Sequence, residues 1–402
     1  MPSPVAGSPL LRLPAVRRLV AAMVLGSGAM VGEQVVLGWL VLELSDSPLL
    51  VGVALAMRMA PLLLAGLPAG MLADRGDRLT LLRGAGLVMA GAAAGVGVLS
   101  LSGAITLGPV LALTFLGGCA RAVHTAARQS HVHDVSGPDR LVDGLALVGL
   151  TMQVGGLAGS LASGALLARL GPGAAYLLVA AGHAGSALAF RRGGALPAAA
   201  APAPPAGAGA GGLLAAARRQ PALPLLLALA AAAEALGFSH QTVLPSLARD
   251  VLRVGPEGLG AMTGARQLGG ILGIAGVRRL RQARGPGALY LAVLGVFGTG
   301  VALLGLAPGY AGTLLLLVAV NAAGAIADVL VQTLIQLSVP ADVRGRAGGA
   351  WVVSIGLGPV GQLQIGAVAS WLGPAAALAA SGAALVVVVA TAAARAPRLR
   401  RL

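Results

Sequence analysis

The chain is a succession of apolar runs, most of them long enough to cross a lipid bilayer, and this feature limits what it can fold into. A spanning helix needs about 20 consecutive, mostly apolar residues. Of the 402 residues, 57% are hydrophobic and only 10% are charged, whereas soluble domains average about 25% charged residues. A soluble globule of this size would need a more charged surface, so soluble enzymes, secreted scaffolds and disordered tails are excluded. The sequence predicts an all-α, polytopic membrane protein.

The apolar runs divide into twelve expected spans, six on each side of a linker. The linker, 191–222, is rich in Pro and Gly and poor in large apolar side chains, which favours a flexible segment. The first six spans are expected at 19–42, 48–72, 80–102, 105–128, 141–168 and 173–190, and the second six at 223–247, 256–278, 287–306, 310–337, 345–371 and 373–394. The expected organisation is a cytoplasmic N-terminus 1–18, a six-helix bundle 19–190, the linker 191–222, a second bundle 223–394 and a basic tail 395–402.

The arginines predict the orientation in the membrane. All 28 basic residues are Arg, and with the N-terminus in the cytoplasm 22 of them lie on the cytoplasmic side of the expected spans. Three lie on the opposite side, namely Arg169, Arg249 and Arg253, and three lie within spans. This distribution obeys the positive-inside rule for an even number of spans. We expect a multi-pass protein of the plasma (inner) membrane with both termini cytoplasmic, and no nucleic-acid partner despite the formal charge of +15.

A charged loop follows the second expected span and reads Gly70-Met71-Leu72-Ala73-Asp74-Arg75-Gly76-Asp77-Arg78. It resembles the signature of the major facilitator superfamily, G-x-L-A-D-R-x-G-R, at the position where that family carries it. Asp77 departs from the usual second Gly, as in the efflux-type branch related to enterobactin and macrolide exporters. The resemblance implies twelve helices in two pseudo-symmetric bundles. It also implies a cytoplasmic gating role for the motif residues, which are Gly70, Leu72, Asp74, Arg75 and Arg78.

Small residues crowd two of the expected spans. Gly155 and Gly159 are four residues apart in the fifth, and Gly356 and Pro359 lie in the eleventh. Small residues at this spacing let helix backbones approach closely in lipid. Two interpretations stay open, tight packing alone or helices that bend or slide during a transport cycle. The Gly155–Gly159 stretch lacks the Pro of the antiporter signature that the family carries in its fifth span.

Six ionisable residues fall inside expected spans, where each costs at least about 2.5–3.5 kcal/mol and therefore needs a partner or a watery cavity. They are Glu33, Arg58, Arg121, Glu234, Arg266 and Asp328. Counted at 1.5 Å per residue, Glu33 and Arg58 lie about 14 and 15 Å from the outer ends of adjacent spans. Glu234 and Arg266 repeat this arrangement at about 20 and 15 Å. The sequence therefore predicts two acid–base pairs, one in each half.

The two remaining charges suggest a third pair. In the family, the first, fourth, seventh and tenth spans line the central cavity. We hypothesise that Arg121 of the fourth span and Asp328 of the tenth pair when the cytoplasmic side is closed. Neutralised pairs that only fix helix packing are the alternative for all six charges.

Proton coupling is the functional interpretation of these charges. Burial in a medium of low dielectric favours a neutral carboxyl group, whereas an adjacent Arg favours the charged form. Glu33, Glu234 or Asp328 is expected to carry the coupling proton, and Glu234 is the first choice because it lies near mid-span. His124, His183 and His240 are expected to be packing residues. His131 and His133 provide too few ligands for a metal site, so no metal or cofactor is expected.

The leading hypothesis for function is a monomeric secondary transporter that exports a small amphipathic organic compound by proton-coupled alternating access. Uptake of a small nutrient by proton symport is the alternative within the same class. A membrane enzyme is disfavoured because no constellation of catalytic groups is found, and an ATP-driven pump because no phosphate-binding loop is present. A nontransporting membrane sensor is the third possibility.

Overall fold

The computed structural model describes residues 14–75, 77–136, 141–190, 222–280, 285–307, 309–339, 347, 350–351, 353–354 and 356–396. Within these ranges every regular element is a helix and no strand occurs. Eight of the described helices are long and apolar enough to cross a membrane. They are Val16–Ser45, Arg78–Leu101, Leu107–Arg128, Leu147–Ala189, Ala222–Val251, Pro286–Leu304, Tyr310–Leu337 and Pro374–Arg395. The prediction of a polytopic, all-helical protein is confirmed.

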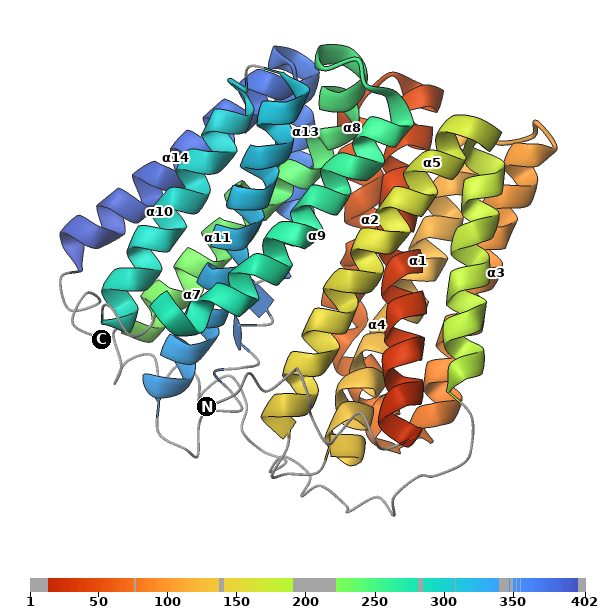
Figure 1. Ribbon diagram of the computed structural model, residues 1–402, viewed down its shortest axis with the longest axis horizontal. Coiled ribbons are helices and arrows are strands. Elements are labelled where there is room, and N and C mark those ends of the chain that lie inside the picture. The colour runs from red at the N-terminus through yellow and green to blue at the C-terminus, as the bar shows by residue number, and fades with distance from the viewer. Residues whose placement is uncertain are drawn as a thin grey trace. The chain divides into compact units, whose positions relative to one another are not determined.

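The helices divide by their mutual contacts into two compact units. The first consists of Met1–Asp46, Met57–Ala201 and Gly255–Gly264, and the second of Ser47–Ala56, Pro202–Val254 and Ala265–Leu402. Each unit is helical, and Figure 1 draws the first mainly from red to yellow and the second mainly from green to blue.

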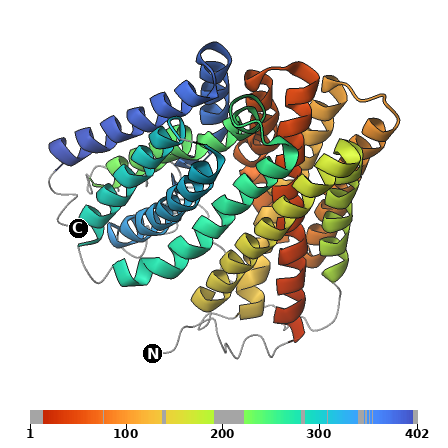
Figure 2. The same ribbon diagram turned by 45° about the horizontal axis from the view of Figure 1, so that its top comes forward.

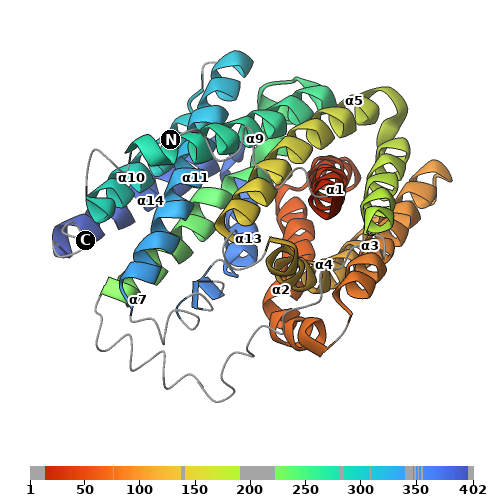
Figure 3. The same ribbon diagram turned by 60° about the horizontal axis from the view of Figure 1, so that its bottom comes forward.

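The first unit is assembled around the pairing of α1 with α5. Its elements are α1 (Pro14–Ser45), most of α2 (Pro48–Arg75), α3 (Arg78–Leu101), α4 (Leu107–Ser136) and α5 (Leu141–Ala189). α5 packs along α1 and α3, and α3 also packs on α4. Figure 3 looks nearly along α1 and shows α5 beside it.

The predicted fifth and sixth spans are both contained in α5. Its backbone leaves the helical conformation at Gly171, with φ 79° and ψ 179°, just before Pro172. A positive φ is accessible to Gly without a Cβ penalty, and Pro begins a helix readily because its missing N–H needs no partner there. Gly171 therefore divides the 49-residue element into two helices.

Asp77, the residue that departs from the family signature, has a local structural role. It is the N-cap of α3, and its Oδ1 accepts a hydrogen bond from the backbone N–H of Leu79 at 3.3 Å. Its Oδ2 accepts from the Thr80 hydroxyl at 2.5 Å. An Asp N-cap satisfies backbone donors that the first helical turn leaves free and places a negative charge at the positive end of the helix dipole. The Asp in place of the usual Gly thus stabilises the start of α3.

The second unit contains regular helices and one irregular one. The regular elements are α9 (Gly255–Leu280), α10 (Pro286–Leu304), α11 (Tyr310–Leu337), α13 (Gly358–Leu372) and α14 (Pro374–Arg395); the first turns of α9 belong to the first unit. α10 packs on both α11 and α14, and Figure 2 shows these three helices side by side.

The predicted seventh span is a chain of short pieces. It begins as α7 (Ala222–Ala232) and continues as the π-helix η3 (Ala233–Gly237), the 3₁₀-helix η4 (Phe238–Val243), α8 (Leu244–Ser246) and the π-helix η5 (Leu247–Val251). Side chains compensate for the irregular backbone, because the Leu236 carbonyl accepts from the Ser381 hydroxyl at 2.8 Å and Nδ1 of His240 lies 2.8 Å from the Gly237 carbonyl. Mid-helix stretches of this kind often mark functional sites.

The glycines of α5 lie where α1 comes closest. A Cβ added to Gly159 would overlap the backbone of Gly28, and one added to Gly155 would overlap Ser27 and the Val24 carbonyl. In the predicted eleventh span, Gly356 lies in a turn and Pro359 in the first turn of α13. The positions of Gly155 and Gly159 agree with tight packing, and those of Gly356 and Pro359 agree with an interrupted helix. A role in bending or sliding stays a prediction.

We expect Gly159→Ala to destabilise the protein by about 1–3 kcal/mol, because the added methyl group has no room between α1 and α5. The matched control is Gly84→Ala in α3, where an added Cβ meets nothing within 4 Å. That change should be neutral or slightly stabilising, since Ala is the better helix former. Thermal unfolding of the purified variants measures both, and equal melting temperatures for the two would contradict the packing argument.

Candidate functional site

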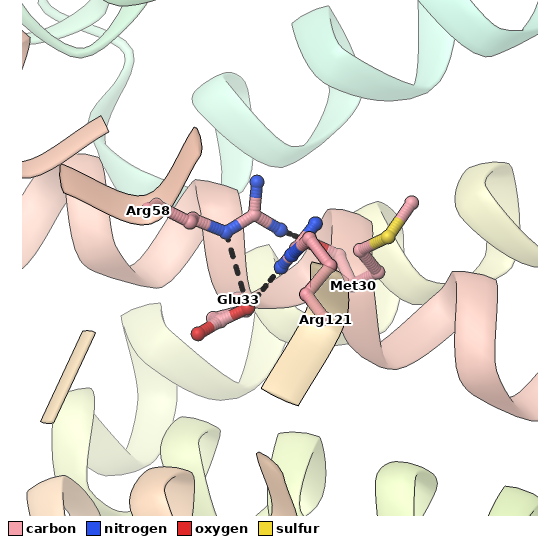
Figure 4. Close-up of polar contacts among 4 residues, drawn as sticks. All are labelled: Met30, Glu33, Arg58 and Arg121. Carbon is pink, nitrogen blue, oxygen red and sulfur yellow. Dashed lines mark hydrogen bonds and ion pairs between the residues drawn. The ribbon is translucent and has the colours of Figure 1, made fainter. Parts of the chain in front are cut away.

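One carboxylate in the first unit joins two arginines. Glu33 of α1 accepts with the same oxygen, Oε2, from Nε of Arg58 at 3.1 Å and from a terminal nitrogen of Arg121 at 3.0 Å. Arg58 also donates to the Met30 carbonyl. Figure 4 shows both guanidinium groups, from α2 and α4, converging on this carboxylate. The predicted Glu33–Arg58 pair is confirmed, and Arg121 is its unexpected third member.

This ionic cluster is largely removed from solvent. Arg58 is 5% exposed, Arg121 is 7% exposed, and the side chain of Glu33 is 13% exposed. Gly118 allows α2 and α4 to approach one another here, because a Cβ on it would lie 2.8 Å from the Arg58 carbonyl oxygen. Breaking a buried ion pair by removing one partner leaves an uncompensated charge, which is strongly destabilising.

A cavity of about 30 Å³ lies beside Arg121 within the first unit. Its polar lining comes from Arg121, His124 and Arg128 of α4, from His183 and Ser186 of α5 and from Ser27 of α1. Four methionines, Met23, Met30, Met89 and Met152, form much of the rest. Arg128 was not singled out from the sequence, because it lies at the end of its expected span, where an Arg is ordinarily explained by topology.

A second cavity, of about 10 Å³, lies within the second unit and brings two acids together. Glu234 of η3 and Asp328 of α11 both line it. Its other walls include Phe238, Tyr290 and Trp351, although aromatic residues form only 2% of the chain. Asp328 accepts a hydrogen bond from Gln332, one turn further along α11, at 3.0 Å.

Two hydrogen-bond donors in the walls of this cavity are buried without a partner among the described residues. They are the hydroxyl of Tyr290 and Nε1 of Trp351. Unpaired buried donors are rare in proteins and are commonly explained by an unseen water, ion or ligand. The two acids and the two unpaired donors are therefore suited to exchange a proton or to bind a water molecule. The sequence analysis did not select Tyr290. The one feature that could have indicated it is its polar hydroxyl group within an otherwise apolar run.

The expected pairing of Glu234 with Arg266 is not formed among the described residues. A terminal nitrogen of Arg266 instead donates to Oε1 of Gln241 at 2.8 Å, and its Nε has no partner within that part of the chain. The pairing was expected because both side chains were placed by counting residues along regular α-helices. Glu234 lies in a π-helix that a 3₁₀-helix follows, and both differ from an α-helix in rise and rotation per residue.

Comparisons with known proteins agree with this architecture. A family model described as transmembrane secretion effector matches residues 6–401, nearly the whole chain. The chain belongs to the major facilitator superfamily. No curated protein sequence matches it at a significant level.

Solved structures share the fold of this major facilitator transporter at low sequence identity. A bacterial homolog of the human lysosomal transporter Spinster, in an inward-facing and unoccupied conformation, is 17% identical with a TM-score of 0.68, and the match covers 98% of each chain. The nucleoside transporter NupG is 14% identical with a TM-score of 0.75, and the match covers 95% of this chain and 99% of NupG. A mutant of the peptide transporter POT in complex with alafosfalin is 16% identical with a TM-score of 0.77, and the match covers 96% of this chain and 95% of POT.

The signature of the major facilitator transporter falls at the junction of α2 and α3. Gly70, Leu72, Asp74 and Arg75 lie in the last turns of α2, and Arg78 is the first residue of α3. The side chains of Leu72, Asp74 and Arg75 are not among those that the structure describes, so the gating role stays a prediction. The hypothesised Arg121–Asp328 pair joins residues of different units and also stays a prediction. The family and the structural neighbours consist of transporters and not of enzymes.

Proposed function

We propose that the protein exports a small amphipathic organic compound, such as a drug, a siderophore or a secondary metabolite, by proton-coupled alternating access. In this proposal twelve spans form two pseudo-symmetric bundles, 19–190 and 223–394, in the plasma membrane, with both termini cytoplasmic and a single chain as the working unit. The secretion description of the family model favours the outward direction.

The observation that carries the proposal is the juxtaposition of Glu234 and Asp328 on one small cavity of the second unit. Two carboxyl groups that share a site of low dielectric resist ionising together, so the pair is suited to carry one exchangeable proton. Water that reaches the cavity during the transport cycle changes this balance, and proton release is thereby linked to the cycle.

The irregular segment that carries Glu234 supports this assignment. Discontinuous helices in transporters commonly form binding sites, because their irregular turns present backbone groups that are not used within the helix. η3 and η4 place such turns beside Glu234. Gly237 keeps them compact, since a Cβ there would overlap the ring of Phe297.

Transport into everted membrane vesicles tests the proposal. A panel of dyes, antibiotics and siderophores is offered with a proton gradient, and we expect at least one compound to accumulate and to leave when a protonophore is added. Accumulation that ignores the protonophore would contradict proton coupling.

Proton-symport uptake is the second candidate, because the structural neighbours include proteins named as nucleoside and peptide transporters. Accumulation by right-side-out vesicles, and none by everted ones, would favour it. A nontransporting sensor is the outcome if no compound of the panel moves in either vesicle preparation.

A further inference from the structure

The interior of the first unit carries more positive than negative charge. Arg58 and Arg121 are buried and Arg128 is partly buried, whereas Glu33 is the one described acid that pairs with any of them. A single carboxylate neutralises one guanidinium group, so two positive charges remain uncompensated within the described part of this unit. Arginine keeps its charge in proteins, and an uncompensated buried charge is costly.

Two of these three arginines, Arg121 and Arg128, border the cavity of about 30 Å³ already described. Nε of Arg121 is buried and has no hydrogen-bond partner among the described residues. A terminal nitrogen of Arg128 lies 3.2 Å from the uncharged sulfur of Met152, which is a weak acceptor. His124 and His183 add ring nitrogens to the same lining. The cavity thus offers hydrogen-bond donors and positive charge, and lacks a described carboxylate in its walls.

The size of the cavity limits its occupant. Space of about 10–15 Å³ holds one water molecule, whereas drug-sized ligands need about 300–1,000 Å³. A cavity of about 30 Å³ therefore admits a small ion or a few waters and excludes an organic substrate. The methionine and histidine side chains in its lining would suit a soft metal cation, but Arg121 and Arg128 repel one.

We propose that this cavity, formed by α1, α3, α4 and α5, binds a small inorganic monoanion of the size of chloride or bromide, held by Arg121 and Arg128. The anion supplies the negative charge that the surrounding side chains lack and stabilises the packing of the first unit. The site is distinct from the acid pair of the second unit, and it depends on neither the direction of transport nor its coupling to protons.

Thermal unfolding of the purified protein in detergent tests the site. The melting temperature is measured in sodium gluconate and then with gluconate replaced stepwise by chloride or bromide at constant ionic strength. A ligand that binds only the folded state raises the melting temperature, and we expect a rise of about 2–5 °C that saturates. Identical melting temperatures in gluconate and in the halides would overturn the proposal.

Two variants locate the effect. Arg128→Gln removes one charge from the cavity and is expected to abolish the halide-dependent rise. Met152→Glu places a carboxylate next to Arg128, so this variant should melt in gluconate at the temperature that the unaltered protein reaches in chloride, with no further rise on adding chloride. Because Met152→Glu is expected to stabilise the protein, it tests the site even if Arg128→Gln does not fold.

Matched controls separate the site from general salt effects. Arg169→Gln removes an arginine whose side chain is 76% exposed, and Glu257→Gln removes its exposed partner. Both variants should retain the full halide-dependent rise. A full rise in Met152→Glu, or its loss in Arg169→Gln, would place halide binding elsewhere and overturn the proposal.

Discussion

Replacing Glu234 with Gln is expected to abolish uphill transport while leaving substrate exchange intact. Gln keeps the shape and the hydrogen-bonding capacity of the side chain but cannot take up or release a proton. Each proton moved down a gradient of one pH unit supplies about 1.4 kcal/mol, which sustains about a tenfold accumulation of substrate. In Glu234→Gln vesicles that accumulation should fall to the level of passive equilibration, whereas exchange of labelled for unlabelled substrate continues.

The same measurement separates the two acids of the pair. Asp328→Asn also leaves one carboxyl group in the cavity, and we expect it to reduce accumulation as well, because Glu234 then loses the neighbouring charge that tunes it. Glu257→Gln, an exposed acid of α9, is the control and should transport normally. Undiminished uphill accumulation by Glu234→Gln would show that the proton travels by another residue.

Replacing Glu33 with Gln is expected to destabilise the protein by about 3–5 kcal/mol, the cost of removing one partner from a buried ion pair. The loss leaves Arg58 and Arg121 facing each other without a counter-charge. Thermal unfolding in detergent measures the loss. The contrasting exposed pair joins Arg169 to Glu257 at 3.4 Å, with side chains 76% and 54% exposed, and Glu257→Gln should change stability by at most about 1 kcal/mol.

A double mutant shows whether the loss arises from the ionic cluster. If Glu33 stabilises mainly by neutralising the arginines, Glu33→Gln combined with Arg121→Gln should cost less than the two single changes added together. Strict additivity of the two single changes would contradict the geometry of Figure 4.

The Glu33–Arg58 pair could be predicted because it depends only on the position of one turn and on the number of residues between that turn and each side chain. The two residues lie on consecutive helices joined by a short turn, so a count of residues from that turn places them at the same depth. The cost of an isolated charge in lipid then makes pairing the expected result. The same count failed for Glu234 and Arg266, because the segment after Glu234 is not a regular α-helix and the depth and direction of its side chains no longer follow from residue number.

The other contacts of the site depend on how each helix is rotated about its own axis. Hydropathy alone does not determine this rotation here. The apolar runs are hydrophobic nearly all round, so they carry little signal of which face meets a neighbour. Arg121 therefore gave no sign that it would join Glu33, nor Asp328 that it would lie with Glu234 on one cavity.

By itself the sequence determined that this chain is a helical membrane protein, where most of its helices begin and end, and which six charges must be accommodated among them. These properties follow from local composition, since the length of an apolar run and the cost of a charge in lipid do not depend on distant residues. Only the tertiary structure decided which charges meet, where a helix departs from regular geometry, and where Arg128, Tyr290 and Trp351 border a cavity. Those outcomes are decided by the close packing of helices, in which the shape and rotation of each depend on all its neighbours.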